Sequence, residues 1–468
     1  GGGRWSVALR EVSGAMFSGC MPRREPLTAD NFPSGPSAPE FNYGTRGAFD
    51  APHQIDAPST SVTRDDADGP YDRVCVIVNV RAPAAKIAVK RLRKLHASVE
   101  VLVMDSESQE KLLRRLQELL VGDADRHPSS GDRTASAVPP PRVRFLAGGG
   151  DGTVAAAASL IALACERARL PQTRRAPVAP LPLGTGNELS RISGWGAAYG
   201  GGSMANIVRN VAGAYLSKLD MWTATIVPSG RGTRGGGFGV DDDAETDASA
   251  ETKVRRKFVC FFSVGFDAHI SHRFTKRRER DPSSCATVWQ NKAWYAYYGA
   301  KEFMSGGGHL TGDDGKRIVE LYVDDKRVDV PRDLNSVQVF NIHSSADGVD
   351  FWGTNRPSVK GELPDSVFVP PCVGDGMLEV VGTRGVSDLV AVRNGFAHSK
   401  RLAQGGRVEL RLSAPVAAQM DGETWVQSPC VVRIEHAGGI PLCVGPGGTR
   451  NLQPGLETTG GGGGCLRL

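Results

Sequence analysis

The sequence has no apolar run of about 18 residues, the length that a membrane-spanning helix needs, so we expect no part of it to cross a bilayer. Its nine cysteines are scattered. The absence of a Cys-x-x-Cys pair and of a secretory signal favours reduced thiols in the cytoplasm over a disulfide framework. The first residue is Gly1 rather than Met, which is consistent with a fragment of a longer protein.

Two well-known phosphate-handling motifs are also missing. The chain contains no Gly-x-x-x-x-Gly-Lys-Ser/Thr loop, and it has neither the His-Arg-Asp nor the Asp-Phe-Gly sequence of protein kinases. The net charge of +5 is small. It is compatible with attraction to an anionic membrane or a nucleotide without requiring either, and we expect no nucleic-acid partner.

Length and composition predict two folded regions with loop-rich segments around them. The 468 residues are enough for two domains of roughly 100–200 residues plus tails. The 58 glycines and 29 prolines exceed average usage, and much of the excess lies at the ends and in insertions. We predict that residues 1–70 are disordered, 223–254 form a disordered insertion and 448–468 form a flexible tail. The folded regions are then 71–222 and 255–447.

The first folded region alternates predicted strands and helices. The predicted elements are strands over Val74–Val80, Val99–Met104, Val143–Ala147 and Val178–Leu183, with helices near Ala84–His96, after Ser106 and over Ala155–Ala164. The opening strand is a continuous β-branched run, which is typical of a parallel sheet covered on both faces. We therefore predict an α/β fold, with an N-terminal doubly wound, Rossmann-like nucleotide-binding domain.

The second region has a different texture, with short strands separated by Gly, Asp or Pro. The predicted strands are Phe258–Val264, Ile318–Val323, Val337–Ile342, Met377–Val381, Val408–Leu412, Val416–Met420 and Val431–Ile434. Helices are expected near Ile270–Arg280, Lys292–Met304 and Ser387–Phe396. This spacing predicts a C-terminal antiparallel β-sandwich domain.

The stretch at residues 148–153, Gly-Gly-Gly-Asp-Gly-Thr, joins a predicted strand to an alanine-rich helix. Glycines let backbone N–H groups approach phosphate oxygens, and a helix N-terminus adds about half a positive charge. The carboxylate of Asp151 would repel phosphate unless a cation such as Mg²⁺ lay between them. A relaxed dinucleotide fingerprint also fits here, but no acidic residue ends a strand about 20 positions later. The pattern favours a metal-bound nucleotide.

A second glycine turn, Gly184-Thr185-Gly186-Asn187, follows the predicted strand at 178–183. In an open parallel sheet, ligands bind at the carboxyl ends of the strands. Asn79 and both glycine turns fall at such ends. The sequence therefore predicts that three loops converge on one nucleotide.

Several motifs in a fixed order resemble those of eukaryotic diacylglycerol kinases. They are GGDGT at 149–153, PLGTGN at 182–187, FSVGFDA at 262–268, NKAWY at 291–295, FWG at 351–353, DGMLEVVG at 375–382, RLAQG at 401–405 and DGETW at 421–425. The resemblance covers roughly residues 74–436. It implies a catalytic domain at 71–222 and an accessory domain at 255–447.

The resemblance implies ATP-dependent phosphorylation of the hydroxyl of diacylglycerol, giving phosphatidic acid in lipid signalling. It implies a cytoplasmic enzyme recruited peripherally to membranes that contain its substrate. The implied catalytic residues are Asp151, Asp421 and Glu423, with Glu423 as general base. The residues implied to hold ATP are Asn79, Gly148, Gly149, Gly150, Gly152, Thr153, Gly184, Thr185, Gly186 and Asn187. Mg²⁺ is assigned to Asp151, and a structural Mg²⁺ of bacterial relatives to the loop at Asp375.

The sequence departs from the family pattern in three places. The loop after the first strand, normally Asn-Pro-x-Ser-Gly, is Asn79-Val80-Arg81-Ala82-Pro83. Glu188 stands where Asp is usual. The tandem cysteine and histidine zinc modules that sense diacylglycerol are missing from this chain.

Simpler interpretations stay open for several of these features. Asp421-Gly422 and Asp375-Gly376 are each also explained as a plain turn. The basic run at 273–280 with its two histidines fits a solvated helix face or a surface that docks on anionic lipid headgroups. Trp294, Tyr295 and Tyr298 suit core packing or lipid contact. The ending Cys-Leu-Arg-Leu only superficially resembles a prenylation signal.

Two functional alternatives also remain. One is a sphingoid or ceramide kinase, and the other is a catalytically silent lipid- or nucleotide-binding regulator, suggested by the altered loop after Asn79. The kinase interpretation requires the carboxylates at 151 and 423 to face each other across one cleft between the two domains.

Overall fold

The structure is a computed structural model that describes residues 73–82, 84–95, 99–104, 109–126, 142–229, 253–285, 287–305, 309–312, 314–353, 368–394, 396 and 399–448. The chain divides into two units, residues 1–62 and 63–468, and every described residue lies in the second. The predicted disordered segment 1–70, residues 230–252 of the predicted insertion and residues 449–468 of the predicted tail lie outside the described residues.

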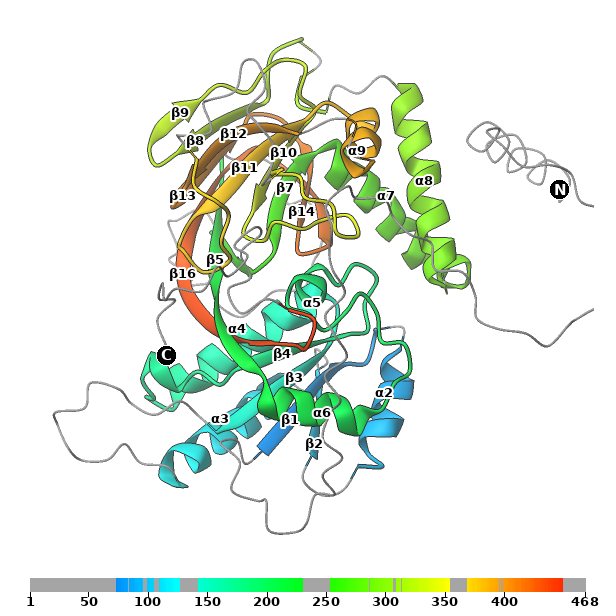
Figure 1. The fold of residues 1–468 in the computed structure, drawn as a ribbon. Coiled ribbons are helices and arrows are strands. Elements are labelled where there is room, and N and C mark those ends of the chain that lie inside the picture. Colours follow the sequence, from blue (N-terminus) through cyan, green and yellow to red (C-terminus); the bar gives the residue numbers. More distant parts are fainter. Residues whose placement is uncertain are drawn as a thin grey trace, which may run out of the picture. The chain divides into compact units, whose positions relative to one another are not determined.

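The first lobe is a parallel sheet with helices on both faces (Figure 1). Its elements are β1 (Arg73–Asn79), α2 (Ala85–Leu92), β2 (Val99–Met104), α3 (Gln109–Arg126), β3 (Val143–Gly149), α4 (Asp151–Arg167), the 3₁₀ turn Gln172–Arg174, β4 (Val178–Pro182), α5 (Glu188–Ile192) and α6 (Met204–Gly213). The strands lie in the order β2-β1-β3-β4, all parallel. The predicted doubly wound α/β fold is confirmed.

The β-branched run of β1 is explained by the two faces that it fills. Val74, Val76 and Val78 pack with the apolar side chains of α2 and α6. Cys75 and Ile77 point the other way and pack with those of α3 and α4. Because successive strand residues alternate between faces, a strand that is covered on both sides needs apolar residues at consecutive positions.

The second lobe contains the antiparallel strands. Its elements are β5 (Tyr215–Pro228), β6 (Val254–Phe258), β7 (Phe261–Gly265), α7 (Phe266–Arg280), the 3₁₀ turn Pro282–Cys285, α8 (Val288–Ser305), β8 (Val319–Val323), β9 (Lys326–Val328), β10 (Ser336–Phe340), β11 (Leu378–Thr383), α9 (Val386–Arg393), β12 (Lys400–Gly405), β13 (Arg407–Leu412), β14 (Val416–Met420), β15 (Glu423–Gln427) and β16 (Cys430–Val444).

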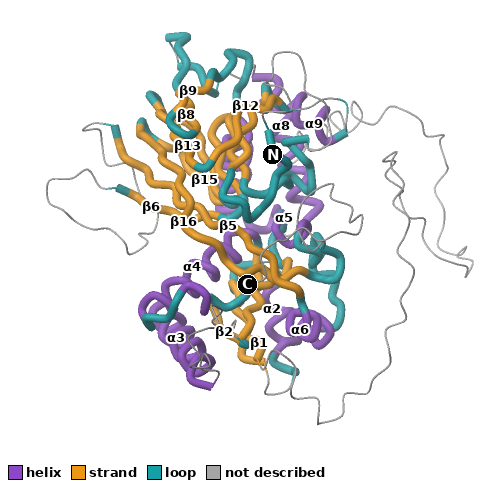
Figure 2. The backbone as a smooth tube through the Cα atoms, turned by 60° about the vertical axis from the view of Figure 1, so that its left-hand side comes forward, coloured by secondary structure: helices purple, strands orange, loops and turns teal. Residues whose placement is uncertain are grey.

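These strands form two sheets that share one apolar core. One sheet has the order β12-β11-β10-β7-β14-β15. In the other, β16, β13, β8 and β9 lie side by side in that order, β5 pairs with β16, and β6 pairs with β5. Side chains such as Phe262, Val339, Leu410 and Val432 meet in the core between the sheets. This is the predicted antiparallel sandwich, and α7, α8 and α9 lie together on one flank of it (Figures 1 and 2).

Two long strands join the lobes, which sequence periodicity did not predict. β5 and β16 pair along their length, with a bulge between His436 and Gly439. One end of β16 pairs with β13 in the second lobe, and the other reaches β4 in the first, where Leu442 pairs with Val178. A single ten-stranded sheet therefore runs through both lobes (Figure 2).

Three element boundaries differ from the predictions. Residues 223–228, expected to open the disordered insertion, form the end of β5 and pair with both β16 and β6. The single strand predicted at Phe258–Val264 is two strands, β6 and β7, in different sheets. β16 runs ten residues beyond its predicted end at Ile434 to Val444.

In the part of the chain that the structure describes, no helix combines the length and apolarity needed to span a membrane.

Candidate active site

The first glycine turn is tighter than expected because β3 continues through Gly149 and α4 starts at Asp151. Gly148 is a buried strand residue that pairs with Val78 and with Leu181, so its backbone belongs to the sheet. Gly150 alone joins the strand to the helix. The first N–H groups of a helix have no preceding helical carbonyl to bind. The N–H groups of Asp151 and Gly152 therefore have no partner within α4 and lie at its N-terminal end.

The loop after β1 contacts this turn. Asn79 donates its side-chain N–H to Thr153 Oγ1 at 3.3 Å, and its Oδ1 accepts from the Arg81 N–H at 3.0 Å. A Cβ on Gly149 would lie 2.1 Å from Thr153 Oγ1. Thr153 therefore packs on bare backbone at Gly149, and this contact requires glycine there. The loop at residues 79–83 is the one with the unusual sequence. Within it Arg81 is exposed, and Pro83 lies outside the described residues.

The second glycine turn touches the first backbone to backbone. The N–H groups of Leu183 and Gly184 both donate to Gly149 O, at 3.0 and 3.1 Å. A Cβ on Gly184 would stand 2.5 Å from the Cα of Gly150. The predicted meeting of the loops after β1, β3 and β4 is therefore present in the fold.

Asn187 shapes its own turn. It has a left-handed φ of 56° and is buried. Its side-chain amide donates to the carbonyls of Gly184 and Ala197, both at 2.9 Å, and its Oδ1 accepts from Gly184 N–H at 3.1 Å. The amide of Asn187 is therefore used in hydrogen bonds to nearby backbone groups. In the same turn, Thr185 is half-buried and Gly186 is exposed.

The carboxylate of Asp151 caps the short helix α5. Its Oδ2 accepts from Glu188 N–H at 2.9 Å and its Oδ1 from Leu189 N–H at 3.0 Å. Burial raises the pKa of Asp151 to about 6, although these two hydrogen bonds oppose the shift. Each oxygen keeps a lone pair, and one or two carboxylates plus phosphate oxygens are the usual ligands of Mg²⁺ in nucleotide sites. Asp151 is thus suited to a nucleotide-bound Mg²⁺ as well as to its structural role.

Asp421 lies in the β14–β15 turn of the second lobe and holds the break between β6 and β7. Its Oδ2 accepts from Val259 N–H at 2.9 Å, and its Oδ1 accepts from the N–H groups of Cys260 and Phe261 at 2.9 and 3.0 Å. Burial raises the pKa of Asp421 to about 7, and the nearby charge of Asp151 adds to the shift. The hairpin-turn interpretation is correct, yet the turn carries a carboxylate into the site.

The two lobes meet at this turn. A Cβ on Gly152 would lie 3.4 Å from the carbonyl oxygen of Asp421. Glu423 follows two residues later as the first residue of β15, with its side chain 72% exposed and paired with Arg256 Nη1 at 3.6 Å. The loops of the first lobe and the Asp421–Glu423 turn therefore lie together as one candidate site. The exposed side chain of Glu423 pairs with Arg256, whereas that of Asp151 is turned to the N–H groups of Glu188 and Leu189.

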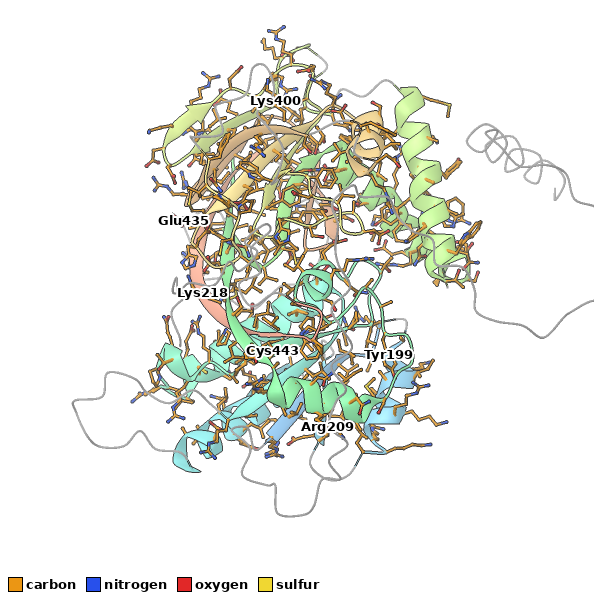
Figure 3. All side chains as sticks on the ribbon, viewed as in Figure 1. Tyr199, Arg209, Lys218, Lys400, Glu435 and Cys443 are labelled. Atoms are coloured by element: carbon orange, nitrogen blue, oxygen red, sulfur yellow. The ribbon has the colours of Figure 1, made fainter. Side chains whose placement is uncertain are left out.

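The loop at Asp375 is occupied by a cationic side chain. Lys218 Nζ lies 2.8 Å from Asp220 Oδ1 and 3.0 Å from Gly374 O (Figure 3 labels Lys218 on β5). Asp220 is fully buried and also contacts His436 Nε2 at 2.8 Å. Asp375 accepts from Met377 N–H at 2.9 Å, and burial raises its pKa. Lys218 therefore places its ammonium group on Asp220 and on the Gly374 carbonyl beside this loop. The assignment of a structural Mg²⁺ to Asp375 stays a prediction.

Among the described residues, no group of three or more His, Cys, Asp or Glu side chains is placed to hold a metal ion. It leaves Asp151 as a ligand only for a metal that arrives with other oxygen donors, such as phosphates.

Glu188 is the site residue whose importance the sequence did not reveal. Its side chain is only 4% exposed and reaches into the second lobe. It accepts from Ser344 Oγ and Asp347 N–H, both at 2.6 Å, and from Gly348 N–H at 3.1 Å. The change from the usual Asp to Glu was visible in the sequence, but the partners of Glu188 lie 156 to 160 residues away in a loop without a motif.

Comparisons with known proteins agree with this architecture. Residues 73–222 match the diacylglycerol kinase catalytic domain, and residues 257–424 match the diacylglycerol kinase accessory domain. Diacylglycerol kinase 2 of Arabidopsis thaliana is 31% identical over 301 residues, which is 64% of this chain and 38% of that protein. Diacylglycerol kinase theta of Homo sapiens is 31% identical over 299 residues, 64% of this chain and 29% of that protein.

Among solved structures, a diacylglycerol kinase from Bacillus anthracis is 14% identical, with a TM-score of 0.39 over 80% of this chain and 98% of that one. The first lobe carries the match to the catalytic domain and the second the match to the accessory domain, so the chain has the two-domain arrangement of one class of protein. The chain belongs to the diacylglycerol kinase family, which confirms the resemblance in its motifs. It spans about two fifths or less of the length of the curated relatives it matches.

Proposed function

We propose that this protein transfers the γ-phosphate of ATP to the free hydroxyl of diacylglycerol, giving phosphatidic acid. The observation that carries the proposal is the meeting of three first-lobe loops with the Asp421–Glu423 turn of the second lobe. Residues 71–222 are the catalytic domain and 255–447 the accessory domain, with β5 and β16 shared between them.

The first lobe is the proposed nucleotide side. The N–H groups at the start of α4 would bind phosphate oxygens, and Thr153 and Asn79 border the same place. Gly150 and Gly184 keep it free of side chains. Asp151 would hold Mg²⁺ together with the phosphates. When bound, the metal would neutralise developing negative charge on the transferred group.

A cavity beside the loop after β1 has cationic residues around a lining that is largely apolar. Its volume is about 540 Å³, and it borders Val80 and Val103. The charged residues that line it are all cationic: Lys86, Lys90, Arg93 and Lys94. Such a wall raises the local concentration of a negatively charged nucleotide.

The second lobe is the proposed acceptor side. Glu423 is the proposed general base, because it follows the turn that contacts Gly152 and its carboxylate reaches solvent, where a lipid hydroxyl could approach. A base must lie within hydrogen-bond reach of the proton that it removes. Asp421 positions this turn through its three backbone hydrogen bonds rather than acting on substrate itself.

The diacylglycerol substrate resides in membranes, so we propose a cytoplasmic enzyme that visits the bilayer peripherally. The test is transfer of radiolabelled γ-phosphate by the purified protein to a panel of lipids in mixed micelles with Mg²⁺. We expect labelled phosphatidic acid from diacylglycerol. Label on a sphingoid base or ceramide instead would identify the alternative kinase. ATP binding without any labelled lipid would favour a silent regulator.

Two variants test the assigned roles. Glu423→Gln should lower kcat by at least about 100-fold while leaving ATP binding nearly unchanged, as expected for a lost general base. Near-normal turnover by Glu423→Gln would exclude that role.

Asp151→Ala should abolish turnover, but it should also reduce stability, since the two capping hydrogen bonds of α5 are lost. Circular dichroism must therefore accompany its assay.

A further inference from the structure

Helix α8 has its polarity inverted relative to an ordinary surface helix. Its buried side chains include those of Asn291 and Glu302. On its outer side, Trp289 is 79% and Met304 is 78% exposed, and Tyr297 is also exposed. With about 100° per residue, these three outward side chains fall on one face, opposite the buried polar ones. A soluble helix normally does the reverse.

Helix α9 extends the same exposed apolar surface. Its Leu389 and Val392 pack inward against an aromatic cluster, while Val390 points outward and is exposed. Phe396, just beyond the helix, is 87% exposed. α9 lies against α8, since a Cβ on Gly299 would be 3.5 Å from Val386 Cγ1, and both views show the two helices side by side (Figures 1 and 2).

The exposed apolar residues are concentrated here. Among the described residues, Phe396, Trp289 and Met304 are the three most exposed large apolar side chains. We call the set Trp289, Tyr297, Met304, Val390 and Phe396 the α8–α9 face. Trp, Tyr and Phe are favoured at the boundary between lipid and water, because the rings suit the headgroup region.

The charge around the α8–α9 face is positive. Helices α8 and α9 together carry three Lys or Arg, at 292, 301 and 393, and two Asp or Glu, at 302 and 388. Glu302 is buried beside His309, and Asp388 is paired with Arg384. By helical geometry Lys292 and Lys301 flank the apolar stripe of α8 on either side. Lys292 is paired with Asp347, which it shares with Arg191 and Arg393, so this cluster keeps a net positive charge. Cations beside exposed aromatics complement an anionic bilayer.

The α8–α9 face is also connected to the candidate active site. Lys292 on α8 and Arg393 on α9 contact Asp347 Oδ2 at 2.9 and 3.7 Å, and Arg191 on α5 contacts Asp347 Oδ1 at 2.9 Å. α5 is the helix that Asp151 caps. A surface joined to the site in this way can set the position of the site above a membrane.

We propose that the α8–α9 face docks into the interfacial region of an anionic bilayer, with Trp289, Met304 and Phe396 entering among the headgroups. The choice of a bilayer over a second protein copy rests on the flanking cations and on the proposed function, in which the phosphoryl acceptor is a membrane lipid. The α8–α9 face is distinct from the basic run of α7. In that run, the guanidinium carbon of Arg277 lies 4.4 Å from the centroid of the Trp294 ring.

The test is flotation of the full chain with phosphatidylcholine vesicles that contain about 30% phosphatidylserine, without nucleotide or diacylglycerol. Wild type should float with these vesicles, and added salt should weaken the binding. The double variant Trp289→Ser/Phe396→Ser should bind at least about tenfold more weakly. The control variant Tyr215→Ser, which removes an exposed ring on β5 instead, should bind like wild type.

A second assay keeps this proposal separate from the proposed function. Phosphorylation of a short-chain, water-soluble diacylglycerol should be the same for wild type and the double variant. If the double variant floats like wild type, or if wild type does not bind anionic vesicles, the docking surface is wrong even when soluble diacylglycerol is phosphorylated. If sedimentation shows a wild-type dimer that the double variant abolishes, a second copy is the partner and the bilayer assignment fails. If binding behaves as expected but no diacylglycerol is phosphorylated, the proposed function alone fails.

Discussion

Asp421 combines a left-handed φ of 46° with a buried carboxylate that accepts three backbone N–H groups. Asp421→Asn tolerates the same backbone conformation but turns an amide N–H₂ toward N–H donors. We therefore expect a loss of about 2–3 kcal/mol in the free energy of unfolding, measured by urea denaturation. Kinase activity should fall with it, because the turn that carries Glu423 loses its anchor.

Asp325→Asn is the matched control. Asp325 also has a left-handed φ, of 64°, but its side chain is 79% exposed. The same change there should cost less than about 0.5 kcal/mol. Equal losses at both positions would mean that the three N–H contacts of Asp421 contribute nothing special.

The raised pKa values of Asp151 and Asp421 predict an unusual pH dependence. Both groups titrate above the ordinary value of 3.8, at about 6 and about 7, chiefly because burial disfavours their charged forms. The folded state therefore holds these protons more tightly than the unfolded chain does. Their contribution to stability is full below about pH 4 and is lost as the pH rises to about 7. In thermal unfolding of the ligand-free protein, the advantage of wild type over Asp421→Asn should shrink over this range. An advantage that grows with pH would contradict the assignment.

Single residues show where sequence reasoning stops. Residue types and motif order selected Asp151 and the Asp421 turn as candidate site residues, and the fold brings these two segments together. They could not show that Asp421 binds the backbone at 259–261, because a contact across about 160 positions leaves no local pattern. They also could not show that the side chain of Asn187 is used within its own turn, since phosphate-binding and turn-forming asparagines look alike in a sequence.

The two glycine turns act as a pair of structural elements. A methyl group on Gly184 would press against the Cα of Gly150 and separate the turns. We expect Gly184→Ala to reduce the free energy of unfolding by about 1–3 kcal/mol and to weaken ATP binding at least about tenfold, measured by calorimetry. Gly213→Ala is the control with the opposite sign: it lies in α6, a Cβ there meets nothing within 4 Å, and alanine in a helix should add about 0.5–1 kcal/mol. Unchanged ATP affinity in Gly184→Ala would exclude the paired-turn arrangement.

Elements with strong periodicity were predictable, and those defined by long-range pairing were not. β2 and β14 fall at the predicted residues, because each is a short apolar run between clear breaks. β6 and β7 were predicted as one strand since residues 258–264 are apolar except for Ser263. Asp421 accepts hydrogen bonds from the backbone at the break, where the chain passes from one sheet to the other.

At the scale of the whole molecule, the two domains expected from the sequence are present as lobes, but they are not separate in the chain. β16 returns from residue 430 to lie beside β4, which puts the end of the second region into the sheet of the first. Asp220 contacts both Lys218 and His436 where β5 and β16 pass between the lobes. Such a return cannot be inferred from local patterning, because Leu442 and Val178 are apolar strand residues like many others.

Glu188 provides the test of how the lobes are coupled. Its backbone belongs to the helix that Asp151 caps, and its carboxylate binds Ser344, Asp347 and Gly348 of the second lobe. Glu188→Asp keeps the charge and the helix start but shortens the side chain by one methylene. The proposed nucleotide contacts lie in the first lobe, whereas the proposed base Glu423 lies in the second. We therefore expect kcat to fall at least about tenfold, with a smaller change in ATP affinity and a loss of about 2–3 kcal/mol in unfolding free energy.

Glu166→Asp is the control for this change, because Glu166 lies near the end of α4 with its side chain 60% exposed. It should leave kcat and the unfolding midpoint close to wild type. If Glu188→Asp weakened ATP binding and kcat equally, the defect would lie in the nucleotide loops rather than between the lobes. If it behaved like Glu166→Asp, the carboxylate at 188 would not join the lobes in solution. A selective fall in kcat is the outcome required if phosphoryl transfer depends on Glu188 holding the two sides of the site together.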